Sequence, residues 1–100
     1  MLQAQIYVDK DALKGSHPLY EFILQFLIRH KIKGATVFRG TLGYGKDQYL
    51  NRPTALFSFD STPMMITFID DDEKVKAALT ALRKEMKGGY IITSQVEQWQ

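Results

Sequence analysis

The chain has 100 residues, of which 45% are hydrophobic, and this length suits a single small domain with its own core. Thirteen basic and eleven acidic residues give a net charge of +2, which is too small to attract nucleic acid or an anionic membrane surface. The absence of cysteine excludes disulfides, thiolate metal sites and thiol nucleophiles. With no basic leader and no apolar run long enough to cross a membrane, we expect a cytoplasmic protein without membrane insertion.

The first third of the chain predicts a strand followed by a helix. Residues Gln3–Val8 alternate apolar and polar side chains, which is the period of a half-buried strand. Lys10–Ser16 is polar and predicts a connection, after which Pro18 is expected as the first helical residue, where a missing N–H is tolerated. Gly34 is expected to mark the end of this helix. Its buried stripe is predicted to consist of Leu19, Phe22, Ile23, Phe26 and Leu27.

The middle of the chain predicts three strands separated by a loop and a turn. Residues Ala35–Leu42 are rich in β-branched and aromatic side chains, and Thr54–Asp60 alternates apolar and polar residues. A turn at Ser61–Pro63 then leads into a strand over Met64–Ile69.

A second helix and a last strand complete the predicted order. The acidic run Asp70–Glu73 precedes apolar residues at helical spacing, and we expect it to cap the helix. Gly88–Gly89 ends the helix, and Tyr90–Val96 is the last strand. Merging the short middle strands gives βαββαβ, the α+β ferredoxin-like sandwich in which two helices cover one face of an antiparallel sheet.

The most informative stretch is Gly34–Lys46, where a β-rich run opens into a loop that carries glycines, an aromatic side chain and a cation. Glycines let backbone N–H groups approach phosphate oxygens, and Lys46 adds positive charge. The same glycines also suit a hairpin or a β-bulge, because the spacing matches neither a P-loop nor a dinucleotide fingerprint. Arg39, within an apolar strand, is either an edge residue with its charge in water or a phosphate or intersubunit contact.

Four stretches of the chain resemble the PII-like signalling superfamily, and most closely its family called domain of unknown function 190. They are Gly15–Glu21, Gly34–Gly45, Ser58–Ile69 and Val75–Val96, and they cover nearly the whole chain in the right order. The most specific element is Gly-Ala-Thr-Val-x-Arg-Gly with Gly-aromatic-Gly after it. The resemblance implies one PII-like ferredoxin-fold domain over residues 1–100, assembled into a compact homotrimer with the sheets facing inward and ligand clefts between subunits.

The resemblance also implies an adenine nucleotide as ligand and a protruding loop, here Gly43–Arg52, that docks on a transporter, a channel or an enzyme. The candidate ligand-binding residues are Thr36, Arg39, Gly40, Gly43, Gly45, Lys46, Gly88 and Gly89. The candidate partner-contact residues in the loop are Tyr44, Asp47, Tyr49 and Arg52.

Two departures from PII proteins bear on the ligand. In those proteins a lysine follows the turn after the second helix and arginines near the C-terminus help to hold phosphates, whereas here Tyr90 follows the glycines and Thr93–Gln100 contains no cation. A triphosphate therefore needs replacement cations, and a monophosphate or cyclic nucleotide is as compatible as ATP. The candidate replacements are Arg39, Lys46, Arg52 and Lys87.

Two other function classes stay open beside the nucleotide-binding regulator. One is a ligand-independent trimeric interaction module for a membrane transport protein, and the other is a metal-responsive trimer. His17 and His30 lie at opposite ends of one predicted helix, about 20 Å apart at helical rise, so they cannot share a metal within one chain. We assign no metal site and no certain cofactor. We expect no enzyme, since no triad, nucleophile elbow or paired carboxylates are present.

Overall fold

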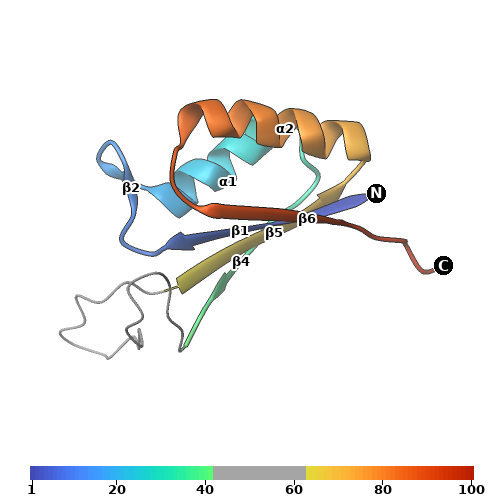
Figure 1. The fold of residues 1–100 in the computed structure, drawn as a ribbon, viewed down its shortest axis with the longest axis horizontal. Helices are drawn as coiled ribbons and strands as arrows, with labels where there is room; N and C mark the ends of the chain where they lie inside the picture. Colours follow the sequence, from blue (N-terminus) through green and yellow to red (C-terminus); the bar gives the residue numbers. More distant parts are fainter. Residues whose placement is uncertain (42–62) are drawn as a thin grey trace.

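A computed structural model describes residues 1–41 and 63–100, in which two helices cover one side of a four-stranded sheet (Figure 1). The sheet order is β4-β5-β1-β6, and each neighbouring pair is antiparallel. This order confirms the predicted α+β ferredoxin-like fold. The predicted strand Thr54–Asp60 lies outside the described residues. The elements are β1 (Leu2–Asp9), β2 (Leu13–Lys14), β3 (His17–Pro18), α1 (Leu19–Arg29), β4 (Thr36–Arg39), β5 (Pro63–Asp70), α2 (Asp72–Glu85) and β6 (Tyr90–Gln95).

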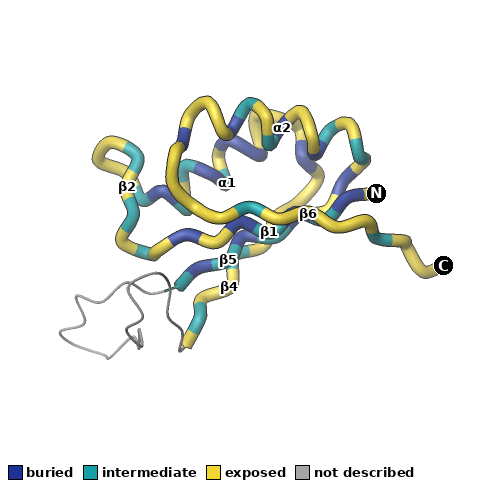
Figure 2. Tube along the Cα trace, viewed as in Figure 1, coloured by how far each residue is buried: buried dark blue, intermediate teal, exposed yellow. Residues whose placement is uncertain are grey.

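The core lies between the sheet and the two helices, as the dark segments in Figure 2 show. Strand β1 buries every second residue, because successive side chains of a strand point to opposite faces. Central strand β5 shows the same alternation, and each helix buries one stripe at helical spacing. The side chains that are most completely buried are Ile6, Ile23, Leu27, Ile66, Val75 and Leu82.

Helix α1 ends at Arg29, so the prediction that Gly34 stops it is wrong. His30 is the C-cap, and Lys31 takes a left-handed conformation with φ 65°. The N–H of Ile32 donates to Leu27 O at 3.1 Å and the N–H of Lys31 donates to Ile28 O at 3.0 Å, the two bonds of a Schellman motif. Glycine usually occupies the left-handed position, and a lysine there gives no signal that sequence reasoning could use.

The predicted connection over Lys10–Ser16 contains a small hairpin instead. Strands β2 and β3 pair through a two-residue turn, in which Gly15 has φ 63°. Pro18 closes β3 and is the N-cap of α1, so the helix begins at Leu19, one residue later than predicted.

Three other predicted boundaries differ from the structure. Strand β4 is shorter than the predicted Ala35–Leu42, and β6 ends before Val96. Pro63 is the first residue of β5 rather than part of a turn, a position where a missing N–H is tolerated at a strand end.

The sheet face away from the helices carries a row of large apolar side chains across all four strands. Phe38 pairs with Met65, Met65 with Tyr7, and Tyr7 with Tyr90. Tyr7 and Tyr90 are also in tilted ring contact, with centroids 6.2 Å apart. Exposed fractions of 53% at Phe38 and 66% at Tyr90 show that nothing in the described chain covers the ends of this row. We call this surface the open face.

Candidate functional site

The described candidate ligand residues at β4 and after α2 lie at one end of the sheet. Register places Arg39–Gly40 beside Pro63–Met64 on β5, and Pro63–Met64 beside Val8–Asp9 on β1. Gly88–Gly89 immediately precedes β6, whose first residue pairs with Tyr7 of β1. The two predicted segments therefore lie in line but at opposite edges, three strand spacings or about 14 Å apart. We call this region, defined by Arg39–Gly40 and Gly88–Gly89, the glycine end.

Other candidate residues lie elsewhere or outside the described chain. Thr36 pairs with Thr67 on the open face, whereas Arg39 pairs with buried Met64 and so belongs to the helix-covered face. One strand thus places Thr36 and Arg39 on opposite sides of the sheet. Outside the described residues are Gly43, Tyr44, Gly45, Lys46, Asp47, Tyr49 and Arg52.

Gly40 and Pro63 fix the two chain ends that flank residues 41–62. The Gly40 N–H donates to Pro63 O at 2.7 Å. A Cβ at position 40 would lie 2.6 Å from Pro63 Cγ, so the two backbones can approach this closely only because residue 40 is glycine. Where the chain leaves β4 and where it enters β5 are therefore neighbouring points.

The turn at Gly88–Gly89 is pressed against β1 through its second glycine. Gly89 has φ 82°, and a Cβ there would lie 2.9 Å from Met86 Cε and 3.2 Å from Val8 Cγ1. Nothing lies within 4 Å of a Cβ built at Gly88. Only Gly89 is therefore required to be glycine for conformational and steric reasons, while Gly88 leaves the turn open on its outer side.

Sequence reasoning missed Arg83 as part of the glycine end. Its guanidinium Nη1 donates to Gly88 O at 2.7 Å and its Nη2 donates to Gly89 O at 3.1 Å. The same fork geometry that suits a carboxylate here holds two consecutive carbonyls. An arginine in the last helical turn before two glycines is the signal that the sequence offers for this contact.

A second cation fastens the β2–β3 hairpin to the same end of α2. The Lys14 ammonium donates to Glu85 O and lies 3.8 Å from the Glu85 carboxylate. It also lies 5.5 Å from the centre of the Phe22 ring. The last carbonyl of α2 is therefore bound by Lys14, while the two carbonyls of the following turn are bound by Arg83.

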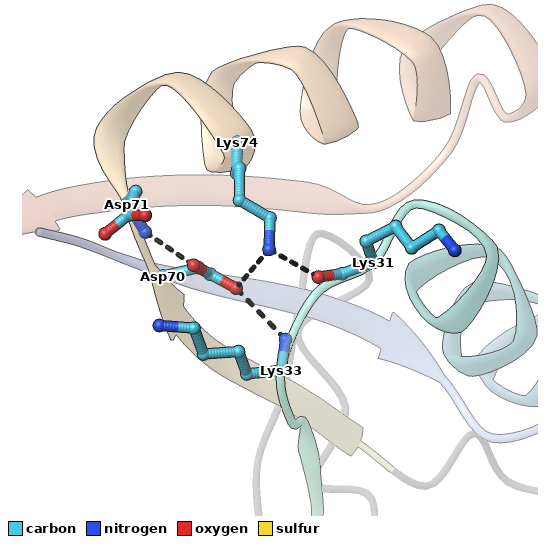
Figure 3. Close-up of polar contacts among 5 residues, drawn as sticks. All are labelled: Lys31, Lys33, Asp70, Asp71 and Lys74. Atoms are coloured by element: carbon cyan, nitrogen blue, oxygen red, sulfur yellow. Dashed lines mark hydrogen bonds and ion pairs between the residues drawn. The ribbon is translucent and has the colours of Figure 1, made fainter.

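The opposite end of the sheet is built around a buried carboxylate, shown in Figure 3. Asp70 accepts hydrogen bonds from the N–H groups of Asp71 at 2.8 Å and Lys33 at 3.0 Å. Lys74 Nζ lies 3.4 Å from the same carboxylate and donates to Lys31 O at 2.6 Å. We call these five residues the aspartate end. They tie the end of α1 to the start of α2 across the end of β5.

The environment of Asp70 favours its charged form. Burial of the side chain would by itself raise its pKa. The N–H groups of Asp71 and Lys33, together with the Lys74 ammonium, outweigh this effect, so the pKa lies below the ordinary value of 3.8. Asp70 is therefore an internal ion with all its stabilising partners supplied by the protein.

The prediction that the acidic run caps α2 needs correction. Asp71 is the N-cap but makes no side-chain capping bond, while Asp70 is used in the buried cluster. Asp72 accepts a hydrogen bond from Gln95 Nε2 at 3.0 Å and pairs with the N-terminal ammonium at 3.1 Å. Gln95 first, and then that ammonium, lower the pKa of Asp72. Three adjacent acids thus have different roles, because consecutive side chains diverge where a strand changes into a helix.

No helix within residues 1–41 and 63–100 is long and apolar enough to cross a membrane. In the same ranges no three histidine or acidic side chains converge as metal ligands.

Solved structures with the same arrangement include those of CPII, a nitrogen regulatory PII-like protein from Thiomonas intermedia K12. The structure bound to ADP, AMP and bicarbonate has a TM-score of 0.64 at 19% identity, covering 93% of this chain and 82% of that chain. A second, bound to ADP and bicarbonate, has a TM-score of 0.60 at 20% identity, covering 94% and 85%. The fold is therefore that of PII-like proteins.

The sequence defines the family more narrowly. A UPF0166 protein of Aquifex aeolicus (strain VF5) is 31% identical over 96 residues, which covers 93% of this chain and 88% of that protein. The pattern of the family DUF190, described as Uncharacterized ACR, matches residues 1–98, and the chain belongs to this family. The predicted resemblance is confirmed.

Proposed function

We propose that the protein is a non-enzymatic, cytoplasmic PII-like regulator that binds an adenine nucleotide at the glycine end. The ligand occupies clefts between the subunits of a homotrimer and sets the conformation of residues 43–52. These residues contact a partner protein, which is a transporter, a channel or an enzyme.

The observation that carries this proposal is the alignment of Arg39–Gly40 with Gly88–Gly89 at one end of the sheet. The Gly40–Pro63 contact lies at this same end, so a ligand here would lie beside both points where residues 41–62 join the sheet. Because about 14 Å of sheet separates the two segments within one chain, a cleft between neighbouring copies is the better way to bring them to one ligand. The ADP and AMP bound to CPII support an adenine nucleotide as that ligand.

The open face supports the homotrimer. In a single chain the row formed by Phe38, Met65, Tyr7 and Tyr90 exposes apolar surface to water, and such patches are typical of protein interfaces. Packing three open faces together would remove these side chains from water while leaving both helices of each copy outside. The face also contains polar residues, such as Gln3 bonded to Thr67 at 3.2 Å, which would fix the register of assembly.

Calorimetric titration with AMP, cyclic AMP, ADP and ATP, each with and without Mg²⁺, tests ligand binding. Micromolar affinity for at least one nucleotide is the expected result, and Arg39→Ala should weaken it about tenfold by removing a charged contact. Lys76→Ala, which removes an exposed cation from α2, is the matched control and should bind as the wild type does. If the wild type binds none of the four nucleotides, a ligand-independent interaction module becomes the better explanation.

Light scattering of the same samples tests assembly. The wild type should have the mass of three chains, and Phe38→Glu should yield monomers because it places a charge within the open face. Lys84→Glu, on the helix side, should remain trimeric. A monomeric wild type would contradict the trimer directly.

A further inference from the structure

Arg83 has an exposed side chain that bonds to backbone groups rather than to another side chain. Its fork binds Gly88 O and Gly89 O at 2.7 Å and 3.1 Å. Two exposed surface hydrogen bonds to neighbouring carbonyls add modestly to stability. Their geometric effect is larger, because they fix the orientation of two successive peptide planes.

The peptide bonds of this turn are trans, so each carbonyl and the N–H of the next residue point in opposite directions. Holding Gly88 O against Arg83 therefore turns the Gly89 N–H away from α2. Within residues 1–41 and 63–100, the N–H groups of Lys87, Gly88 and Gly89 donate to no backbone carbonyl. Successive free N–H groups around a left-handed residue form a concave site that suits an anion.

Arg83 also changes the strength of these donors. A cation bonded to a carbonyl polarises its peptide group, and the N–H at the other side becomes a better hydrogen-bond donor. The guanidinium is thus able to act on an anion through the peptide group without touching it. A lysine would keep the charge but would lose the two-pronged contact.

We infer that Arg83 is a positioning residue for an anionic ligand group, of the phosphate class, at Gly88–Gly89. Its bond to Gly88 O holds that carbonyl on the side of α2 and thereby directs the free Gly89 N–H at the ligand, while its bond to Gly89 O fixes the peptide group that leads into β6. This role compensates in part for the missing lysine after the turn, where Tyr90 stands. The inference rests on the proposed function for the identity of the complete ligand, while the anion site itself can be tested alone.

The test compares wild type, Arg83→Lys, Arg83→Gln and Lys84→Gln as full chains. ADP affinity should fall about tenfold in Arg83→Lys although the net charge is unchanged, and at least as far in Arg83→Gln. Lys84→Gln removes a neighbouring exposed cation and should bind within about twofold of the wild type. Thermal unfolding of each variant checks the fold, and wild-type affinity in Arg83→Lys would overturn the inference.

A second readout distinguishes this inference from the proposed function. If no nucleotide binds the wild type, the proposed function fails, and inorganic phosphate is titrated while the amide resonances of Gly88 and Gly89 are followed by NMR. Phosphate-dependent shifts in the wild type that are lost in Arg83→Lys support the positioning role. The absence of shifts in the wild type, or equal shifts in both proteins, would overturn it.

Discussion

Both ends of the sheet fasten a loop to helix α2, but one does so by binding N–H groups to an anion and the other by binding carbonyl groups to cations. At the aspartate end a buried anion receives two backbone N–H groups and an ammonium, so its hydrogen-bonding partners come from the protein itself. At the glycine end cations bind carbonyls, and the N–H groups of Gly88 and Gly89 donate to no carbonyl within the described chain. The aspartate end is a self-contained cluster that stabilises the fold, whereas the glycine end leaves hydrogen-bond donors available to a ligand.

The ends also differ in how the chain leaves its helix. Both exits use a left-handed residue, which is Lys31 after α1 and Gly89 after α2. At Gly89 a Cβ would lie 3.2 Å from Val8 Cγ1 of β1, while Lys31 remains exposed and its carbonyl is bonded to Lys74. Tight packing therefore adds to the conformational preference for glycine at one end, whereas at the other end only the conformational preference applies.

The largest expected effect comes from removing the internal anion. Asp70→Ala leaves two N–H groups and the Lys74 ammonium without their partner, and should lower the free energy of unfolding by about 3 kcal/mol. Urea unfolding measures this loss. Asp71→Ala, which removes an exposed carboxylate that makes no capping bond, should change stability by less than about 0.5 kcal/mol. An equal decrease in the free energy of unfolding of both variants would contradict the stabilising role of the buried Asp70.

A somewhat smaller effect is expected at the glycine end. Gly89→Ala combines a left-handed conformation with a Cβ 2.9 Å from Met86 Cε, and should cost about 2 kcal/mol. Gly88→Ala is the paired control, since a Cβ there meets nothing within 4 Å. Its unfolding midpoint in urea should match the wild type. Similar midpoints for both alanine variants would contradict the tight packing of Gly89 against β1.

Acid should weaken the aspartate end selectively. Because the folded state lowers the pKa of Asp70 below 3.8, the folded protein binds fewer protons there than the unfolded chain. The stabilisation is complete above the unfolded pKa and is lost as pH falls through the lowered folded pKa. As the pH is lowered from 5, the free energy of unfolding should therefore fall less in Asp70→Asn than in the wild type, and urea unfolding at each pH measures it. Parallel pH profiles would exclude this linkage.

The smallest effect has the opposite sign. Lys31→Gly should raise the free energy of unfolding by about 0.5 to 1 kcal/mol, because glycine adopts the left-handed conformation without a Cβ penalty. The bond from Lys74 is to the backbone carbonyl of residue 31 and survives the change. Lys31→Ala should give no such gain. Thermal unfolding of the pair decides the point, and destabilisation by glycine would contradict it.

Sequence periodicity predicted the helices and strands that bury one face and expose the other. Strand β1 was recognisable because Ala4, Ile6 and Val8 alternate with polar residues, and α2 because Val75, Ala78 and Leu82 share a face. These patterns are local, so they need no knowledge of the partner segment.

The features that were missed depend on distant or unusual partners. Asp70 bonds to a backbone N–H 37 residues earlier, and no spacing rule predicts that contact. Lys31 is left-handed without being glycine, and Arg83 uses carbonyls that any sequence would supply. The alignment of Arg39 with Gly88–Gly89 in the candidate site depends on the register of three strand pairs, which the sequence alone does not reveal.

The contact between Gly40 and Pro63 has a consequence for substitution at position 40. A Cβ there would lie 2.6 Å from Pro63 Cγ, and the proline ring cannot swing aside as the end of a flexible side chain can. Any side chain at position 40 would therefore push the end of β4 away from the start of β5 and weaken the hydrogen bond from the Gly40 N–H to Pro63 O.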